Sequence, residues 1–79
     1  MDSKEIGNRL RKLRGDKSIA EVSEATGIGE SALRNYESGF RIPRDYVKLV
    51  LARYYGVSVD ELFFPQELHE MSSSEAEAI

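Results

Sequence analysis

The side chains that could take part in chemistry in this 79-residue sequence are charged and polar rather than nucleophilic. There is no cysteine, which excludes a disulfide, a thiolate nucleophile and a thiolate metal ligand, and which favours a reducing cytoplasm. The one histidine, His69, lacks neighbours in the pattern of a metal site or of a nucleophile and its base. The sequence therefore predicts no enzyme, no metal site and no cofactor, and leaves binding as the chemistry to explain.

The basic residues suited to binding an anionic partner are unevenly distributed. All 11 Lys and Arg lie between Lys4 and Arg53, whereas four of the 14 acidic residues follow Pro65. Residues 1–64 thus hold 11 basic and 10 acidic groups, a net charge of +1, and residues 65–79 carry −4. A near-neutral domain can still bind nucleic acid when its basic groups gather on one face.

The elements that would position these side chains are helices. Apolar residues recur at helical spacing, Ser18-x-x-Glu21 and Ser58-x-x-Glu61 have the form of capping boxes, and glycines follow several of the segments. The pattern predicts an all-α chain with helices at about 4–14, 18–26, 30–38, 44–55 and 58–63.

The same pattern predicts one domain over residues 1–64 and an acidic tail rich in Ser and Ala over residues 65–79. No apolar run is long enough for a membrane span, and the first 14 residues have no signal-peptide core. Because these two segments account for all 79 residues, we expect no small-molecule sensing domain.

The central part of the chain has the spacing of two short helices joined by a tight turn. Val22, Leu33 and Tyr36 would face inward, and Ile28 would fill the space between the helices after Gly27. This is the spacing of a helix-turn-helix unit that binds DNA. It also fits any helical hairpin in a small bundle, and the spacing alone leaves both interpretations open.

Four motifs together resemble one known family. They are IGNRLRKLR at residues 6–14, GIGESALRNYESG at 27–39, Arg41-x-Pro43, and GVSVDEL at 56–62. In this order they are similar to the Cro/phage-repressor family, also called the XRE-type helix-turn-helix family. The resemblance covers residues 6–63 and implies a five-helix, lambda-repressor-like domain whose third helix enters the major groove of DNA. It also implies a homodimer on double-stranded DNA with a near-palindromic operator.

Carried over by position, the residues implied to read bases are Glu30, Ser31, Arg34 and Asn35. Arg34 can donate two hydrogen bonds to guanine O6 and N7, and Asn35 can pair with adenine N6 and N7. Glu30 can accept from cytosine N4, but it is equally a favourable charge at a helix N-terminus. The alternative for Arg34 and Asn35 is an ordinary solvated face.

The resemblance implies two further sets of residues. Phosphate contacts would come from Lys17, Ser18, Ser38, Gly39, Arg41 and Arg44, although any single basic residue could serve solubility alone. Arg14 and Glu37 match a family ion pair that ties the first helix to the end of the third. We expect this pair to be architectural rather than base-reading.

The expected dimer surface lies at the end of the domain. Leu62, Phe63 and Phe64 form an apolar end that we do not expect a domain this small to bury alone, and Leu68 and Met71 continue it at rough helical spacing. We expect a symmetric dimer centred on residues 59–71, with Phe64 at its core. The alternative is that Phe63 and Phe64 cover the core of their own monomer.

The sequence departs from the family at three places. The linker between the first two helices is about two residues short, Ile19 replaces a polar residue that contacts phosphate, and Gly29 replaces a capping Ser or Thr. The expected function is a transcriptional repressor of bacterial, phage or mobile-element origin. The competing hypothesis is a protein-interaction module, such as an antitoxin or anti-repressor partner, that uses Ile19, Phe40, Phe64 or the acidic tail.

Overall fold

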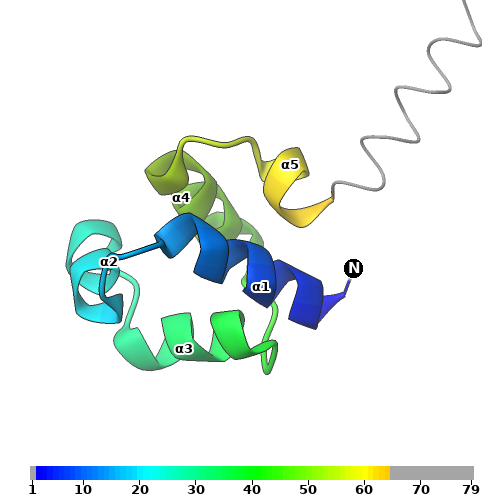
Figure 1. Ribbon diagram of the computed structural model, residues 1–79. Coiled ribbons are helices and arrows are strands. Elements are labelled where there is room, and N and C mark those ends of the chain that lie inside the picture. Colours follow the sequence, from blue (N-terminus) through cyan, green and yellow to red (C-terminus); the bar gives the residue numbers. More distant parts are fainter. Residues whose placement is uncertain (1, 65–79) are drawn as a thin grey trace, which may run out of the picture.

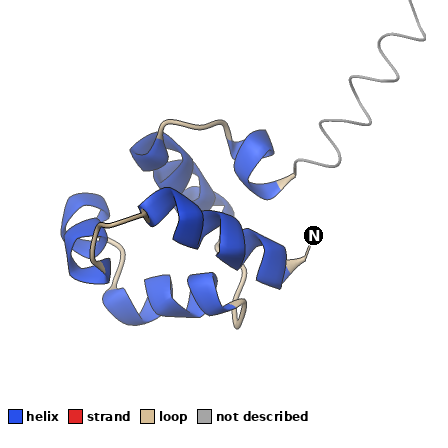
Figure 2. Cartoon of the chain, viewed as in Figure 1, coloured by secondary structure: helices blue, strands red, loops and turns tan. Residues whose placement is uncertain are grey.

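The computed structural model describes residues 2–64, and within them it contains five α-helices and no strand (Figures 1 and 2). The helices are α1 (Ser3–Arg14), α2 (Ile19–Thr26), α3 (Glu30–Ser38), α4 (Asp45–Tyr55) and α5 (Val59–Phe63). The predicted all-α, five-helix fold is confirmed. None of the helices in this part of the chain has the length and apolar character needed to cross a bilayer.

Side-chain caps fix where three of the helices begin. The Asp2 carboxylate accepts from the backbone N–H of Lys4 at 2.9 Å. Ser18 Oγ accepts from the N–H of Glu21, and Ser58 Oγ from the N–H of Glu61, each at 3.0 Å. These bonds satisfy N–H groups that have no partner inside the helix, so the two serine capping motifs in the sequence mark real helix starts.

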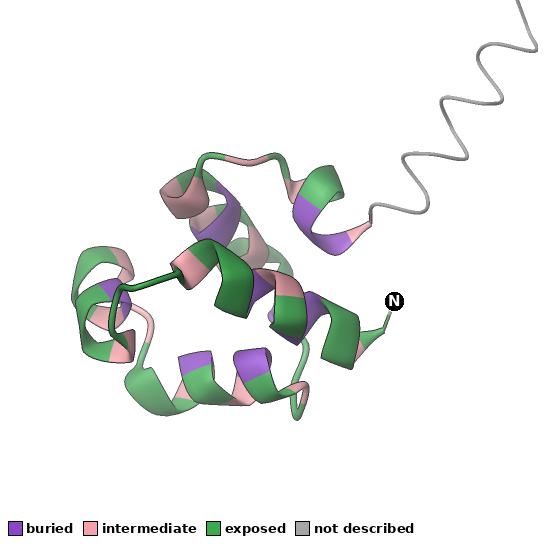
Figure 3. Cartoon of the chain, viewed as in Figure 1, coloured by how far each residue is buried: buried purple, intermediate pink, exposed green. Residues whose placement is uncertain are grey.

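The core is formed where the inward faces of all five helices meet (Figure 3). Helix α1 packs on α3 along one side and on α5 along the other, while α4 contacts α2 and α5 (Figure 1). The buried apolar side chains are Ile6, Leu10, Val22, Leu33, Tyr36, Leu51, Ala52, Leu62 and Phe63. Because α1 lies between α3 and α5, it sets the position of α3 relative to the rest of the domain.

Two glycines allow α1 and the end of α3 to approach closely. A Cβ at Gly7 would overlap the carbonyl oxygen of Glu37 and would lie 2.8 Å from that of Tyr36. Gly39 ends α3 with φ of +82°, and a Cβ there would lie 3.0 Å from the Cα of Lys4. The two helices are therefore in backbone contact, which only glycine permits at these positions.

Candidate nucleic-acid interface

Helices α2 and α3 are joined by a turn whose geometry is fixed by hydrogen bonds. Thr26 Oγ1 donates to the carbonyl of Val22 at 2.7 Å and accepts from the N–H of Ile28 at 3.2 Å. Gly27 takes a left-handed conformation, and Ile28 packs against the core. The turn therefore holds the start of α3 at a defined angle to α2, as the hairpin spacing in the sequence predicts.

Helix α3 turns one face to the core and the opposite face to solvent. Leu33, Tyr36 and Glu37 are buried, whereas Glu30, Ser31 and Arg34 are exposed and Asn35 is half-buried. Residues 30, 31, 34 and 35 lie on one side of the helix, because positions four apart on a helix are neighbours. The structure thus places the four base-reading candidates together, with Asn35 the least accessible.

Two of these candidates contact each other. Arg34 Nη2 lies 3.4 Å from Glu30 Oε1, and the two side chains are 62% and 48% exposed. An exposed ion pair of this kind contributes only about 0–1 kcal/mol. Arg34 can therefore leave Glu30 for a stronger acceptor at little cost.

The loop after α3 is tied to the helix through one carbonyl. The oxygen of Asn35 accepts from the N–H of Phe40 at 2.9 Å, from the N–H of Arg41 at 3.2 Å, and from the Ser38 hydroxyl at 3.1 Å. The N–H of Gly39 also donates within the helix end, to Tyr36 at 3.2 Å. Two of the residues expected to contact phosphate, Ser38 and Gly39, therefore already donate hydrogen bonds within the protein.

Four other phosphate candidates sit at the edges of this unit. Arg41 and Arg44 are exposed in the loop between α3 and α4, and Lys17 and Ser18 are exposed before α2. The Lys17 ammonium lies 4.7 Å from the centre of the Tyr54 ring, a cation–π contact that does not use up its N–H donors. The Ser18 oxygen caps α2 and leaves its proton to donate elsewhere.

Ile19, at a position where the resemblance implies a polar residue, is partly buried and packs against the core. Its side chain contributes to the packing of α2 on the domain.

Arg14 and Glu37 form a two-bond ion pair between α1 and α3. Arg14 Nε donates to Glu37 Oε2 at 2.7 Å and Arg14 Nη2 donates to Glu37 Oε1 at 2.9 Å. A third bond runs from Arg14 Nη1 to the carbonyl of Lys17 at 2.8 Å. The side chains are 21% and 7% exposed, and the hydrogen bonds to Glu37 raise the pKa of Arg14 above its usual value. One guanidinium thus connects α1, α3 and the linker that leads into α2.

Tyr55 lies in the electrostatic field of this pair. Burial, and secondarily the nearby Glu37 carboxylate, raise the pKa of its phenol from 10.0 to about 12, because both disfavour a phenolate. The folded protein therefore keeps this proton at a pH where the unfolded chain has lost it. The associated stability is complete below pH 10 and is lost as the pH rises toward 12.

We expect Tyr55→Phe to flatten the loss of stability at alkaline pH. Urea unfolding of wild type and variant, followed between pH 10 and pH 12, measures the two slopes. The wild-type free energy of unfolding should fall more steeply, since only the wild type has this phenol to ionise. Parallel pH profiles for the two proteins would contradict the assignment.

The residues expected to form a dimer surface are placed differently from one another. Leu62 and Phe63 are each only 2% exposed and belong to the monomer core. Phe64 is half-buried, with the Lys48 ammonium 5.3 Å from its ring centre. Leu68 and Met71 lie outside the described residues. Of the three aligned apolar residues at the end of α5, only Phe64 therefore keeps surface to offer a partner.

Further apolar exposure lies in the loop before α4 and on α4 itself, where sequence reasoning had singled out only Phe40. Phe40 and Tyr46 are each 76% exposed, and Ile42 and Leu49 are also exposed. We refer to these four residues as the loop–α4 surface. Tyr46 and Leu49 are three apart on α4 and lie outside the apolar stripe that contains Val47 and Leu51, which was the available signal in the sequence.

A helix-turn-helix unit anchored on α1, with a polar outer face on its second helix, defines a helix-turn-helix domain of the DNA-binding type. A family model described as a helix-turn-helix domain matches residues 5–62, and the chain belongs to this family. The match confirms the family that the sequence motifs indicate. No curated protein and no solved structure matches the chain.

Proposed function

We propose that this protein binds a specific double-stranded DNA sequence as a homodimer and represses transcription by occupying its operator. The observation that carries the proposal is the outer face of α3, where Glu30, Ser31 and Arg34 are exposed together while the opposite face is anchored in the core. A helix anchored in this way can enter the major groove without losing its packing.

Within the groove, the accessible residues have distinct tasks. Arg34 supplies the forked donor that suits guanine, and Glu30 can accept from cytosine once it is released from Arg34. Arg41 and Arg44 follow α3 in the exposed loop and are suited to the phosphates that flank the base-reading helix. Asn35, which is half-buried, contributes after its side chain turns outward.

The test is to select bound sequences from random DNA and then to compare two arginine variants on the selected site. Arg34→Ala should lose about 1–3 kcal/mol of binding free energy and relax the preference at one base position. Arg41→Ala is the matched control, because it should weaken all sequences alike and reduce the salt dependence of binding. Gel-shift titrations at several salt concentrations measure both effects. If Arg34→Ala selected the same DNA sequence as the wild type, Arg34 would not be a base-reading residue.

A dimer follows from the small number of base pairs that one such helix can read. Two domains placed about 34 Å apart, one DNA turn, would combine two half-sites. The loop–α4 surface suits a two-fold contact, because it is apolar and directly follows α3.

We therefore expect Tyr46→Ser to weaken the dimer by at least about tenfold, since exposed aromatic residues are frequent anchors of interfaces. Light scattering over a range of concentrations measures the dissociation constant. Phe64→Ala is the comparison, because Phe64 was the expected centre of the alternative surface on α5. A dimer that survives Tyr46→Ser and dissociates with Phe64→Ala would place the interface at the end of the domain.

The loop–α4 surface also supports a second candidate function, a partner-binding module of the antitoxin or anti-repressor kind. Phe40 and Tyr46 would then contact another protein in place of a second copy. Gel shifts on the DNA upstream of the protein's own gene separate the two functions. Specific, salt-dependent binding supports the repressor, and its absence supports the partner-binding module.

A further inference from the structure

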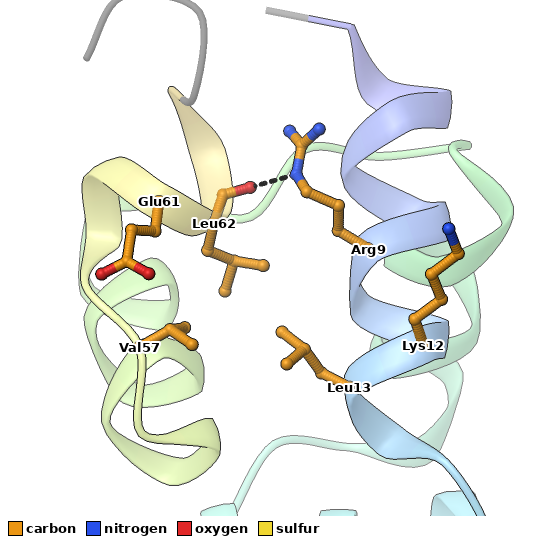
Figure 4. Close-up of a pocket in the computed structure, with 6 residues that line it drawn as sticks. All are labelled: Arg9, Lys12, Leu13, Val57, Glu61 and Leu62. Carbon is orange, nitrogen blue, oxygen red and sulfur yellow. Dashed lines mark hydrogen bonds between the residues drawn. The ribbon is translucent and has the colours of Figure 1, made fainter. Parts of the chain in front are cut away.

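A cleft between α1 and the end of the domain is not used by either proposed function. It has a volume of about 260 Å³, and its walls are mainly apolar (Figure 4). The lining residues are Arg9, Lys12 and Leu13 from α1, and Val57, Glu61 and Leu62 from α5 and the turn before it. This volume is at the small end for a ligand pocket and suits one or two side chains.

The cleft is held open by a bond between its two walls. Arg9 Nε donates to the carbonyl of Leu62 at 2.6 Å, which fixes α1 relative to α5. Figure 4 shows the two terminal nitrogens of Arg9 pointing away from this carbonyl. Lys12 and Leu13 are exposed on the same wall. The site therefore combines a preformed apolar floor with a positively charged rim on α1.

We propose that the C-terminal segment of the same chain occupies this cleft, with Leu68 inserted between Leu13 and Val57. The described part of the chain ends at Phe64, two residues after Leu62, which lines the cleft. Leu68 follows Phe64 by four residues, a span of up to about 13 Å when extended. The segment is thus attached beside the site that it fills.

The charges of the two partners are complementary. Glu67 directly precedes Leu68 and Glu70 follows it by two residues, while Arg9 and Lys12 form the α1 rim. Glu61 is the one acidic residue that lines the cleft, and it lies on the opposite wall. In the proposed docked state, the acidic residues of the segment would lie beside the basic α1 wall and away from Glu61.

The covalent link between the domain and its C-terminal segment favours docking within one chain over docking of the segment from a second copy. A segment linked through a few flexible residues reaches an effective concentration in about the millimolar range. In addition, α5 and α3 lie on different sides of α1 (Figure 1), so docking keeps the −4 charge of residues 65–79 away from the outer face of α3. This inference does not depend on DNA binding.

The test uses a spin label on the full-length chain in the absence of DNA. Because the chain has no cysteine, Ser72→Cys gives a single labelling site. We expect the label to broaden the methyl resonances of Leu13 and Val57 strongly and those of Ile28, in the turn between α2 and α3, little. Equal broadening at all three residues, or none at Leu13 and Val57, would overturn the proposal.

Variants of the labelled chain then test each contact. Leu68→Asp should abolish the selective broadening, and Ile79→Asp, the same kind of change farther along the segment, should leave it intact. Lys12→Glu should lower the docked population about fivefold, and Arg53→Glu, an equal charge change on α4, should not. If Leu68→Asp and Ile79→Asp had the same effect, the proposed contact of Leu68 would be wrong. If Lys12→Glu and Arg53→Glu had the same effect, the proposed contact of Lys12 would be wrong.

A mixing experiment identifies which chain supplies the segment. Spin-labelled chain without isotopes is mixed with isotope-labelled chain that carries no spin label. We expect no selective broadening of Leu13 in the mixture. Broadening there would show that a second copy supplies the segment, and would overturn docking within one chain.

Discussion

Gly7→Ala should lower the free energy of unfolding by about 2–4 kcal/mol and the melting temperature by about 10–25 °C. The added methyl group would overlap the backbone carbonyls of Glu37 and Tyr36, which cannot rotate out of the way. Alanine gains about 0.5–1 kcal/mol over glycine in a helix, which is too little to offset separation of α1 from α3. Thermal and urea unfolding measure the loss.

Asn8→Ala is the matched control for this prediction. Asn8 is the next residue on α1 and is exposed, so its replacement should change stability by no more than about 0.5 kcal/mol. If the two variants were equally stable, the helices would not be in backbone contact at Gly7.

Removing the Glu37 carboxylate should have an effect of similar size for a different reason. Glu37→Ala leaves the Arg14 guanidinium largely shielded from water without its two-bond partner. Breaking a fully buried pair costs about 3–5 kcal/mol, and the partial exposure of Arg14 reduces the expected loss to about 2–4 kcal/mol. Urea unfolding near neutral pH measures it.

Glu30→Ala tests whether burial is the cause. It also removes a glutamate that pairs with an arginine, but both partners of that pair are largely exposed. We expect a loss below about 1 kcal/mol. If Glu30→Ala and Glu37→Ala lowered the free energy of unfolding equally, burial of the Arg14–Glu37 pair would not be the cause of its effect. A double-mutant cycle with Arg14→Ala then isolates the coupling between Arg14 and Glu37.

The parts of the fold that the sequence predicts well are those set by local chemistry. The helix that begins after Ser18 and the one that begins after Ser58 were predictable because each serine caps the backbone three residues later. The outward face of α3 was predictable because Leu33 and Tyr36 mark its inward face at helical spacing.

The features that were not predictable depend on contacts between distant residues. The bond from Arg9 to Leu62 joins positions 53 apart, and no local pattern specifies it. Whether Phe63 was core or surface depended on how α5 closes over α1. The exposure of Phe40 and Tyr46 likewise follows from the path of the loop before α4, which short-range spacing does not determine.

The single carbonyl of Asn35 has a mechanical consequence. Because it anchors the backbone of both Phe40 and Arg41, the first residues of the loop move with α3 as one rigid piece. A force applied at Arg41 is transmitted to the helix with no hinge between them. If Arg34 and Arg41 bind DNA as proposed, little backbone freedom is lost in this segment, so the entropic cost of ordering its backbone is met during folding.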